Sequence, residues 1–201
     1  MYRTNREADT NEMLFEHWIY SLAIAILVGM VYFKFTGRDY AWIIVASAYV
    51  PDMDIIADAV LKKIGITVLL YGNPIRHGDF HNIAFLLLFA VSVALLLHPL
   101  GIRLVDSFFF AGIGFGAHLF EDALVAKSAY PFLWPFSMER FGIGIFNYSR
   151  DWYGVANTEV LLVGVVLVVL AVILRTAYEG VGWVMRSMPN ILPATITGNL
   201  K

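Results

Sequence analysis

Long apolar runs, separated by short polar segments, make up most of the 201-residue sequence. A helix needs about 20 predominantly apolar residues to cross the hydrocarbon core of a bilayer. Five runs approach or can reach that length, and they cover residues 18–33, 40–61, 82–97, 104–126 and 160–174. The pattern predicts an all-α, polytopic bundle of about five membrane-spanning helices, which forms a single integral membrane domain over residues 1–201.

The second of these runs is interrupted. It is apolar over residues 40–50 and then meets Pro51, which is followed closely by Asp52 and Asp54. Proline removes a helical hydrogen bond and kinks or breaks a helix. We therefore expect a short or broken second span that carries the aspartates inside it and ends at Lys62 and Lys63.

Three segments lie outside the expected spans. Residues 1–16 are polar and of mixed charge, without the basic start and small-residue cleavage site of a signal peptide. Residues 128–157 form a loop rich in Tyr, Trp and Phe, which favour the membrane interface, and we expect this loop to shape the mouth of a substrate site. The tail covers residues 180–201. More lysine and arginine residues fall on the N-terminal face than on the other, which favours a cytoplasmic N-terminus.

The amino-acid composition indicates whether the protein is surrounded by water or by lipid. The chain is 59% hydrophobic and 15% charged, with a mean hydropathy of +0.70, whereas soluble domains have about 45–50% apolar and about 25% charged residues. We therefore expect a protein of the cell (plasma) membrane, in contact with membrane lipids. The net charge of −2 indicates no nucleic-acid surface, and the absence of cysteine excludes disulfides and thiolate-bound zinc.

Ionisable side chains within this apolar sequence gather in four places. Such residues are costly in lipid and usually mark functional sites. His118 and Asp122 are four residues apart, so on a helix they share one face and can bind one metal ion. The other candidate ligands are His17 at the start of the first span, Asp52 and Asp54 beside Pro51, and His77 and His81 before the third span.

The four places reach a similar depth if the spans alternate in direction. Asp52 lies about 18 Å along the second span and His118 roughly 21 Å along the fourth, at the helical rise of 1.5 Å per residue. Both spans start at the far face, whereas His17 and His81 lie at the face shared with the N-terminus. This agreement favours one metal site near the N-terminal side of the membrane.

Each pair also has a simpler interpretation. His118 and Asp122 can form a hydrogen-bonded pair that joins two helices, and histidines at a membrane surface, His17 included, can simply be solvated. Asp52 and Asp54 point to opposite sides of a regular helix. Either Pro51 opens the backbone so that both converge, or only one is a ligand and Asp58 partners Asp54.

The order of these motifs resembles that of the YdjM-like membrane-bound metal-dependent hydrolases. The resemblance covers residues 17–137 and rests on His17, the Pro51-Asp52-x-Asp54 motif, the 76–81 segment, the His118-x-x-x-Asp122 motif and the Trp-Pro-Phe-Ser sequence at 134–137. The family reads His-Arg-x-x-Thr-His-Ser in the third motif, whereas this chain has Arg76-His77-Gly-Asp-Phe-His81-Asn. This departure favours His81 over His77 as a ligand. The resemblance implies a metal-dependent hydrolase.

The chemistry of the candidate residues is compatible with that activity. Imidazole and carboxylate ligands best suit Zn²⁺, with Mn²⁺ or Fe²⁺ as alternatives, and such a metal activates water for hydrolysis. Asp79 or Glu121 can act as a general base, and Arg76 can hold an anionic group. A site at headgroup depth favours an amphiphilic substrate, such as a phospholipid-like ester or phosphoester.

Two other functions fit the same residues. A proton- or metal-ion-coupled transporter also places His and Asp side chains inside the membrane, and a helix bundle can use a polar cluster only to fix its packing. The sequence leaves the oligomeric state open.

Overall fold

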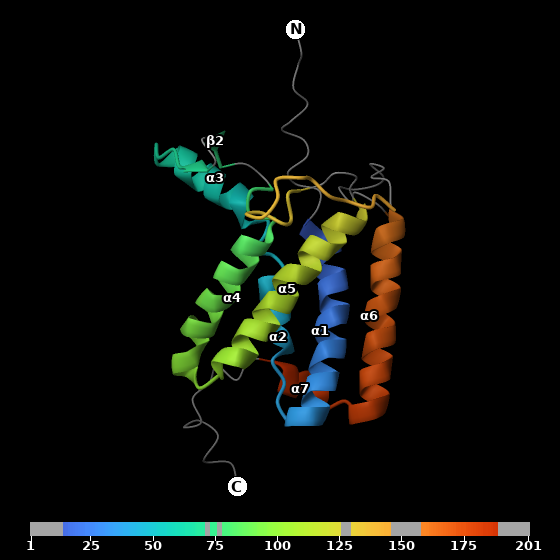
Figure 1. Ribbon diagram of the computed structural model, residues 1–201. Helices are drawn as coiled ribbons and strands as arrows, with labels where there is room; N and C mark the ends of the chain where they lie inside the picture. Colours follow the sequence, from blue (N-terminus) through green and yellow to red (C-terminus); the bar gives the residue numbers. More distant parts are fainter. Residues whose placement is uncertain (1–13, 71–72, 76–77, 126–129, 146–157, 189–201) are drawn as a thin grey trace.

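The computed structural model of the chain describes residues 14–70, 73–75, 78–125, 130–145 and 158–188. Four long helices form a bundle (Figure 1): α1 (Leu14–Thr36), α4 (Ile83–Leu97), α5 (Leu104–Val125) and α6 (Thr158–Glu179). The shorter elements are α2 (Ala41–Ser47), α3 (Met53–Lys63), the 3₁₀ helix η1 (His98–Leu100), α7 (Trp183–Ser187) and a two-stranded hairpin of β1 (Leu69–Leu70) and β2 (Asn73–Pro74).

The four long helices are each apolar and long enough to cross a membrane. The stretches concerned are Trp18–Thr36, Ile83–Leu100, Leu104–Leu124 and Leu161–Glu179. Their outer faces expose large apolar side chains, and Leu88 and Leu96 of α4 are 63% and 72% exposed. Surfaces of this kind are stable against lipid hydrocarbon rather than water. The predicted all-α transmembrane bundle is confirmed.

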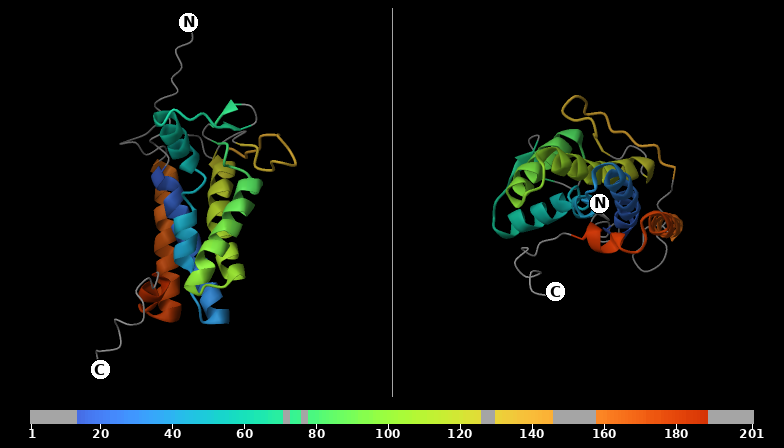
Figure 2. Two further views of the ribbon diagram at one scale, coloured as in Figure 1. Left: turned by 90° about the vertical axis from the view of Figure 1, so that its left-hand side faces the viewer. Right: turned by 90° about the horizontal axis from the view of Figure 1, so that it is seen from below.

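The second passage through the bundle is short, as the proline in the sequence suggested. Helix α2 has seven residues and is followed by a turn that contains Pro51 and Asp52. The expected continuation of this span to residue 61 is wrong, because α3 leaves the bundle and projects from the end where α1 begins (Figures 1 and 2). With Asp54, Asp58, Lys62 and Lys63 among its eleven residues, α3 is too polar to lie in hydrocarbon.

Helix α2 packs between α1 and α5, while α1 also packs against α6 and α4 against α5. The buried centre of the bundle is apolar and includes Ile43 and Ile44 of α2 and Phe110 of α5. Gly114 of α5 permits a close approach to α2, since a Cβ atom at this position would lie 2.3 Å from the carbonyl oxygen of Ile44. This contact positions the end of α2 and hence the turn that carries Asp52.

A network of charged residues ties the opposite end of the bundle together. Arg175 of α6 is fully buried and forms ion pairs with Asp39, which precedes α2, and with Glu179. Its Nη1 donates a hydrogen bond to the carbonyl of Ile26 in α1 (3.2 Å), and its guanidinium lies over the ring of Trp183 in α7. The network therefore connects α1, the start of α2, α6 and α7.

Candidate metal centre

Three segments that are far apart in sequence meet at the end of the bundle where α1 begins. They are the turn between α2 and α3, the loop before α4, and the last turns of α5. They contribute Asp52, His81, and the pair His118 and Asp122, all of which are buried. His81 and His118 are only 1% and 0% exposed, so bulk water does not solvate their rings.

The loop before α4 is shaped to aim His81 inward. Asn82 caps α4 by accepting a hydrogen bond from the backbone N–H of Phe85 (3.1 Å), and its side-chain amide donates to the carbonyl of Asp79 (2.8 Å). Gly78 has a φ of 96°, a conformation that favours glycine. A Cβ atom at Gly78 would also lie 2.4 Å from the ring of Tyr130.

Three potential ligand atoms form a nearly equilateral triangle. His81 Nε2 lies 3.3 Å from His118 Nε2 and 3.4 Å from Asp52 Oδ1, and the third side, between His118 Nε2 and Asp52 Oδ1, is 3.5 Å. Ligands about 2.0–2.1 Å from a tetrahedral Zn²⁺ lie roughly 3.3–3.4 Å from one another. The triangle thus has the size of one face of such a tetrahedron, and Asp52, His81 and His118 can hold a metal ion.

Asp122 lies against the same two imidazoles. Its Oδ2 is 3.3 Å from His81 Nε2 and 3.5 Å from His118 Nε2. The two histidines are therefore flanked by a carboxylate from the α2–α3 turn and a carboxylate from α5. The i, i+4 spacing of His118 and Asp122 does bring both side chains to one face of α5.

Asp54 occupies a different position from Asp52. Its Oδ2 lies 3.6 Å from Nδ1 of His81 and accepts hydrogen bonds from the backbone N–H groups of Gly78 (2.8 Å) and Phe80 (3.4 Å). Both aspartates converge on His81, because the chain turns at Pro51 instead of continuing as a helix. The alternative with Asp58 as the partner of Asp54 is wrong, since Asp58 pairs with Lys62 (2.6 Å) on the outside of α3.

These carboxylates change the protonation of His81. Burial lowers the pKa of the imidazole, but hydrogen bonds to Asp52 and Asp54 and the charge of Asp122 raise it, with a net increase to about 9. The aromatic ring of Tyr130 covers the imidazole at a centroid distance of 4.3 Å. In the absence of a metal ion, His81 is therefore protonated at neutral pH.

Two further predicted site residues, Glu121 and Asp79, have contacts of their own, and the other three lie outside the described part. Glu121 is buried, and its Oε1 accepts a hydrogen bond from Ser21 of α1 (3.4 Å). Asp79 lies in the turn before His81, where its backbone carbonyl receives the Asn82 bond. The side chain of His17, and Arg76 and His77 as whole residues, lie outside the described residues, so their predicted roles stay predictions.

Sequence reasoning missed several residues that support the centre, namely Ser21, Gly78, Asn82 and Tyr130. Only Asn82 carries a local signal, because an asparagine directly before a long apolar run is a typical helix N-cap. Ser21 and Tyr130 meet their partners across 100 and 49 residues of sequence, respectively, and no local pattern indicates such a contact.

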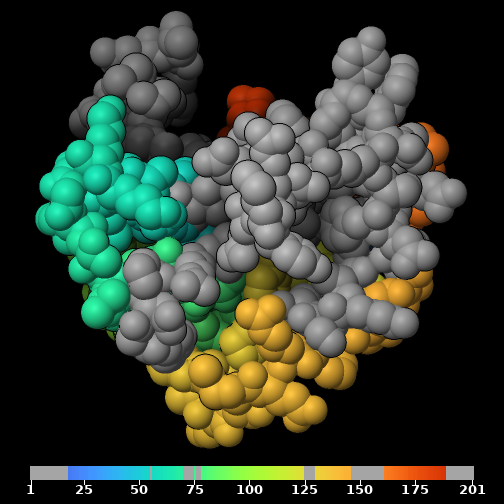
Figure 3. All heavy atoms as spheres, turned by 90° about the horizontal axis from the view of Figure 1, so that it is seen from above, coloured from blue at the N-terminus to red at the C-terminus, as the bar shows by residue number. Residues whose placement is uncertain are grey.

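The loop that follows α5 lies over the same end of the molecule. Its described part, residues 130–145, returns along the end of α5, where Ile143 and Ile145 donate backbone hydrogen bonds to the carbonyls of Ala123 and Leu124. Seen from this end, the loop and α3 both lie on the visible face (Figure 3). Phe136 is 86% exposed and Phe141 57% exposed, so the loop presents aromatic side chains outward.

The fold and the cluster together define an integral membrane helix bundle with a buried His/Asp cluster that can hold a metal ion. The chain belongs to the YdjM inner membrane protein family, whose sequence profile matches residues 13–184. It is accordingly a protein of the inner membrane, and the predicted family and location are confirmed. No match was found among curated proteins or among solved structures.

Proposed function

We propose that this protein is a divalent-metal-dependent hydrolase that cleaves a lipid-like ester or phosphoester at the membrane surface. The observation that carries the proposal is the buried triangle of Asp52, His81 and His118, with sides of 3.3–3.5 Å. Two imidazoles and a carboxylate are a donor set suited to Zn²⁺, with Mn²⁺ and Fe²⁺ as alternatives. Three protein ligands leave a coordination position open, as in catalytic zinc sites.

Asp52, His81 and His118 would hold the ion. When bound, it supplies Lewis acidity and lowers the pKa of a water molecule to about 7. The carboxylate of Asp54 lies 3.6 Å from Nδ1 of His81, and a carboxylate on this side would hold the ring with Nε2 toward the other two ligands. Asp122, which lies against both imidazoles, can complete the ligand set or accept the proton of the attacking water. Glu121 is bonded to Ser21, which favours Asp122 over Glu121 for this second role.

The position of the site supports an amphiphilic substrate. The cluster lies where the apolar spans end, beneath a loop whose exposed side chains include Phe136 and Phe141. Aromatic residues at such a level sit among lipid headgroups. An ester or phosphoester of a membrane lipid is at this depth, whereas a bond within the acyl chains is not.

The middle of the bundle argues against a transporter. The buried cluster between the two ends is built from apolar residues, among them Ile43, Ile44 and Phe110. Proton and ion pathways through membrane proteins are lined by chains of polar or ionisable groups. Within the described residues, the region on the inner side of the His/Asp cluster is an apolar core and not a chain of ionisable groups.

The experiment combines metal analysis with turnover. Purified protein in detergent is analysed for bound metals by plasma mass spectrometry and incubated with dioleoyl phosphatidylglycerol, and products are identified by mass spectrometry. We expect one stoichiometric divalent metal, and turnover that a chelator abolishes and metal restores. Asp52→Asn should abolish turnover, while Asp58→Asn, which changes an aspartate on the outside of α3, should not.

Two results would overturn the proposal. One is wild-type protein that binds no divalent metal after incubation with Zn²⁺, Mn²⁺ or Fe²⁺. The other is metal-loaded protein that cleaves neither ester nor phosphoester bonds across a panel of membrane lipids.

A further inference from the structure

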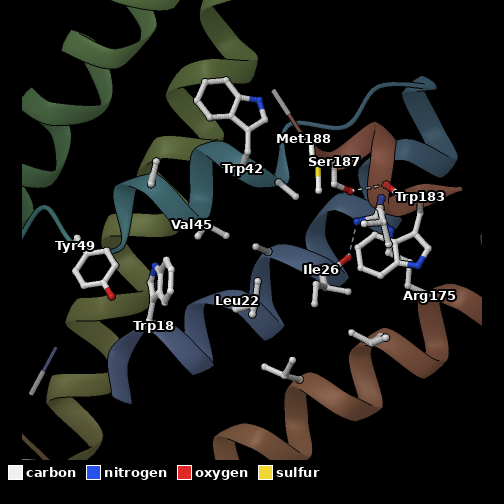
Figure 4. Close-up of a pocket in the computed structure, with 16 residues that line it drawn as sticks. Trp18, Leu22, Ile26, Trp42, Val45, Tyr49, Arg175, Trp183, Ser187 and Met188 are labelled. Atoms are coloured by element: carbon white, nitrogen blue, oxygen red, sulfur yellow. Dashed lines mark hydrogen bonds between the residues drawn. The ribbon is translucent and has the colours of Figure 1, made fainter. Parts of the chain in front are cut away.

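An apolar groove runs along the membrane-spanning part of the molecule, on a side of the bundle formed by α1, α2, α6 and α7 (Figure 4). Its volume is about 590 Å³, within the range of about 300–1,000 Å³ that is usual for ligand pockets. The walls consist almost entirely of hydrocarbon side chains, including Leu22, Val45, Val168 and Val172.

The groove lies where α2 and α6 both pack against α1, with α7 at one end. The α1 wall extends from Trp18 to Ile26, a length of about 12 Å at the helical rise of 1.5 Å per residue. These residues belong to a membrane span, as do Val168 and Val172. The groove is therefore open to the hydrocarbon core of the bilayer, where the ligands available to it are lipid chains.

One end of the groove adjoins the candidate metal centre. Tyr49 and Trp18 pack against each other there, with ring centroids 5.4 Å apart. Tyr49 is three residues before Asp52 in the chain. Both residues lie in the turn that follows α2, so this end of the groove lies beside the segment that carries a proposed metal ligand.

The other end is closed by the charged network around Arg175. Its guanidinium forms ion pairs with Glu179 and Asp39 and donates a hydrogen bond to the carbonyl of Ile26. Glu179 also pairs with Arg186 (2.6 Å), so the two arginines are balanced by two carboxylates. The charge that borders the groove at this end, on Arg175, is thus paired with carboxylates, and the Trp183 ring covers the guanidinium.

We propose that the groove binds one hydrocarbon chain of a glycerophospholipid, with the headgroup at the metal centre and the chain running past Tyr49 toward Arg175. The apolar lining selects the chain, and the two ends set its direction. The direction rests on the proposed hydrolase function. Occupancy of the groove by a lipid chain does not, which makes the two separable by experiment.

The first test uses a phosphatidylglycerol with a diazirine midway along one acyl chain. Full-length protein in bicelles that contain this lipid is irradiated, and labelled peptides are mapped by mass spectrometry. We expect labelling to concentrate on the groove walls in α1, α2, α6 and α7. Ala46→Trp fills the groove from an exposed position on α2, and it should reduce groove labelling at least tenfold.

A matched control and a second variant keep this test decisive. Val91→Trp adds an indole to the exposed face of α4, outside the groove, and should leave the labelling unchanged. Leu22→Trp narrows the groove from the α1 side and should act like Ala46→Trp if the latter does not fold. Asp52→Asn should retain groove labelling, because chain binding does not depend on the metal.

Three outcomes would overturn the inference. If all lipid-facing helices are labelled equally and neither groove variant changes the labelling, the lipid only surrounds the protein and does not occupy the groove. Cross-linking of two protein copies through groove residues would show a dimer interface in its place. If a diazirine placed near the headgroup labels Trp183 in preference to Tyr49, the lipid lies in the groove in the opposite direction.

The second test concerns kinetics. Ala46→Trp should raise the KM for dioleoyl phosphatidylglycerol at least tenfold while leaving the turnover of dibutyryl phosphatidylglycerol and the metal content unchanged. Groove labelling without hydrolysis of any lipid would refute the hydrolase proposal and leave a lipid-binding groove. Hydrolysis with an equal effect of Ala46→Trp on both chain lengths would refute the groove as the substrate site.

Discussion

The two ring nitrogens of His81 have different neighbours, and this difference organises the whole centre. Nδ1 faces Asp54, while Nε2 faces Asp52, His118 and Asp122. A histidine that binds a metal through one nitrogen commonly donates the other N–H to a carboxylate, which fixes its orientation. The same arrangement here makes Nε2 the nitrogen available to an ion.

We predict that metal binding depends on His118 and Asp122 together. Changing either residue to alanine removes a group that lies 3.3 Å from His81 Nε2. Bound metal should fall at least tenfold, measured by plasma mass spectrometry after dialysis. His98→Ala is the matched control, because His98 is exposed at the other end of α4. If both site variants retain one metal ion per protein, α5 does not supply ligands to the metal.

A second prediction at this scale follows from the raised pKa of His81. The metal-free side chain carries a proton up to about pH 9, whereas a metal ligand must be a neutral imidazole. Zinc binding at pH 7 should therefore release about one proton from His81, and the apparent affinity should rise about tenfold per pH unit up to the pKa. Titration calorimetry in buffers of different ionisation enthalpy measures the release. A heat that is independent of the buffer would contradict the prediction.

Among the elements, α2 has the largest influence on the site relative to its length. Its seven residues are held between α1 and α5, and the turn after it carries Pro51 and Asp52. The backbone carbonyl of Ile44 and the side chain of Ser47 lie so close to Gly114 that a Cβ atom there would be 2.3 and 2.8 Å away, respectively. Any displacement of α2 also displaces Asp52.

Gly114→Ala is therefore expected to lower both the thermal stability and the metal content of the purified protein. The methyl group would overlap with the α2 backbone, and α2 must shift to accommodate it. Gly112→Ala tests the same substitution on the same helix, where the nearest atoms to a Cβ atom are 4.0 Å away. Equal unfolding midpoints and metal contents for the two variants would show that close α2–α5 packing does not position the site.

On the scale of the whole molecule, the two ends of the bundle differ in kind. At the end where α1 begins, carboxylates and imidazoles surround a space that suits a cation. At the other end, Arg175 is ion-paired with Asp39 and Glu179. Gly29 leaves room for its guanidinium, since a Cβ atom there would lie 2.8 Å from Nη1. One end carries a His/Asp cluster that can hold a metal ion, and the other joins helices from both ends of the sequence.

Arg175→Met should destabilise the protein by about 3–5 kcal/mol, because it leaves the carboxylate of Asp39 buried without its cation. Equilibrium unfolding in mixed detergent micelles measures the loss. Lys62→Met breaks an exposed pair with Asp58 and should cost less than about 1 kcal/mol. The prediction is contradicted if the two variants unfold at the same denaturant concentration.

The sequence alone determined that this protein lies in a membrane and where most of its helices form. Backbone groups in lipid must be hydrogen-bonded within their own segment, so a long apolar run has few alternatives to a helix. The same local logic explains why His118 and Asp122 lie on one face of α5, since i, i+4 spacing is a property of the helix itself. Pro51 likewise indicated that the second span would break at this point.

Only the tertiary structure decided where the chain goes after that break and which side chains meet. Proline shows that a helix ends but not in which direction the next one leaves, and α3 departs from the bundle instead of completing the span. Asp54 lies against Nδ1 of His81 and Glu121 bonds to Ser21 because distant segments pack together. The apolar groove likewise depends on α2 and α6 both packing against α1, an arrangement that no local pattern of residues specifies.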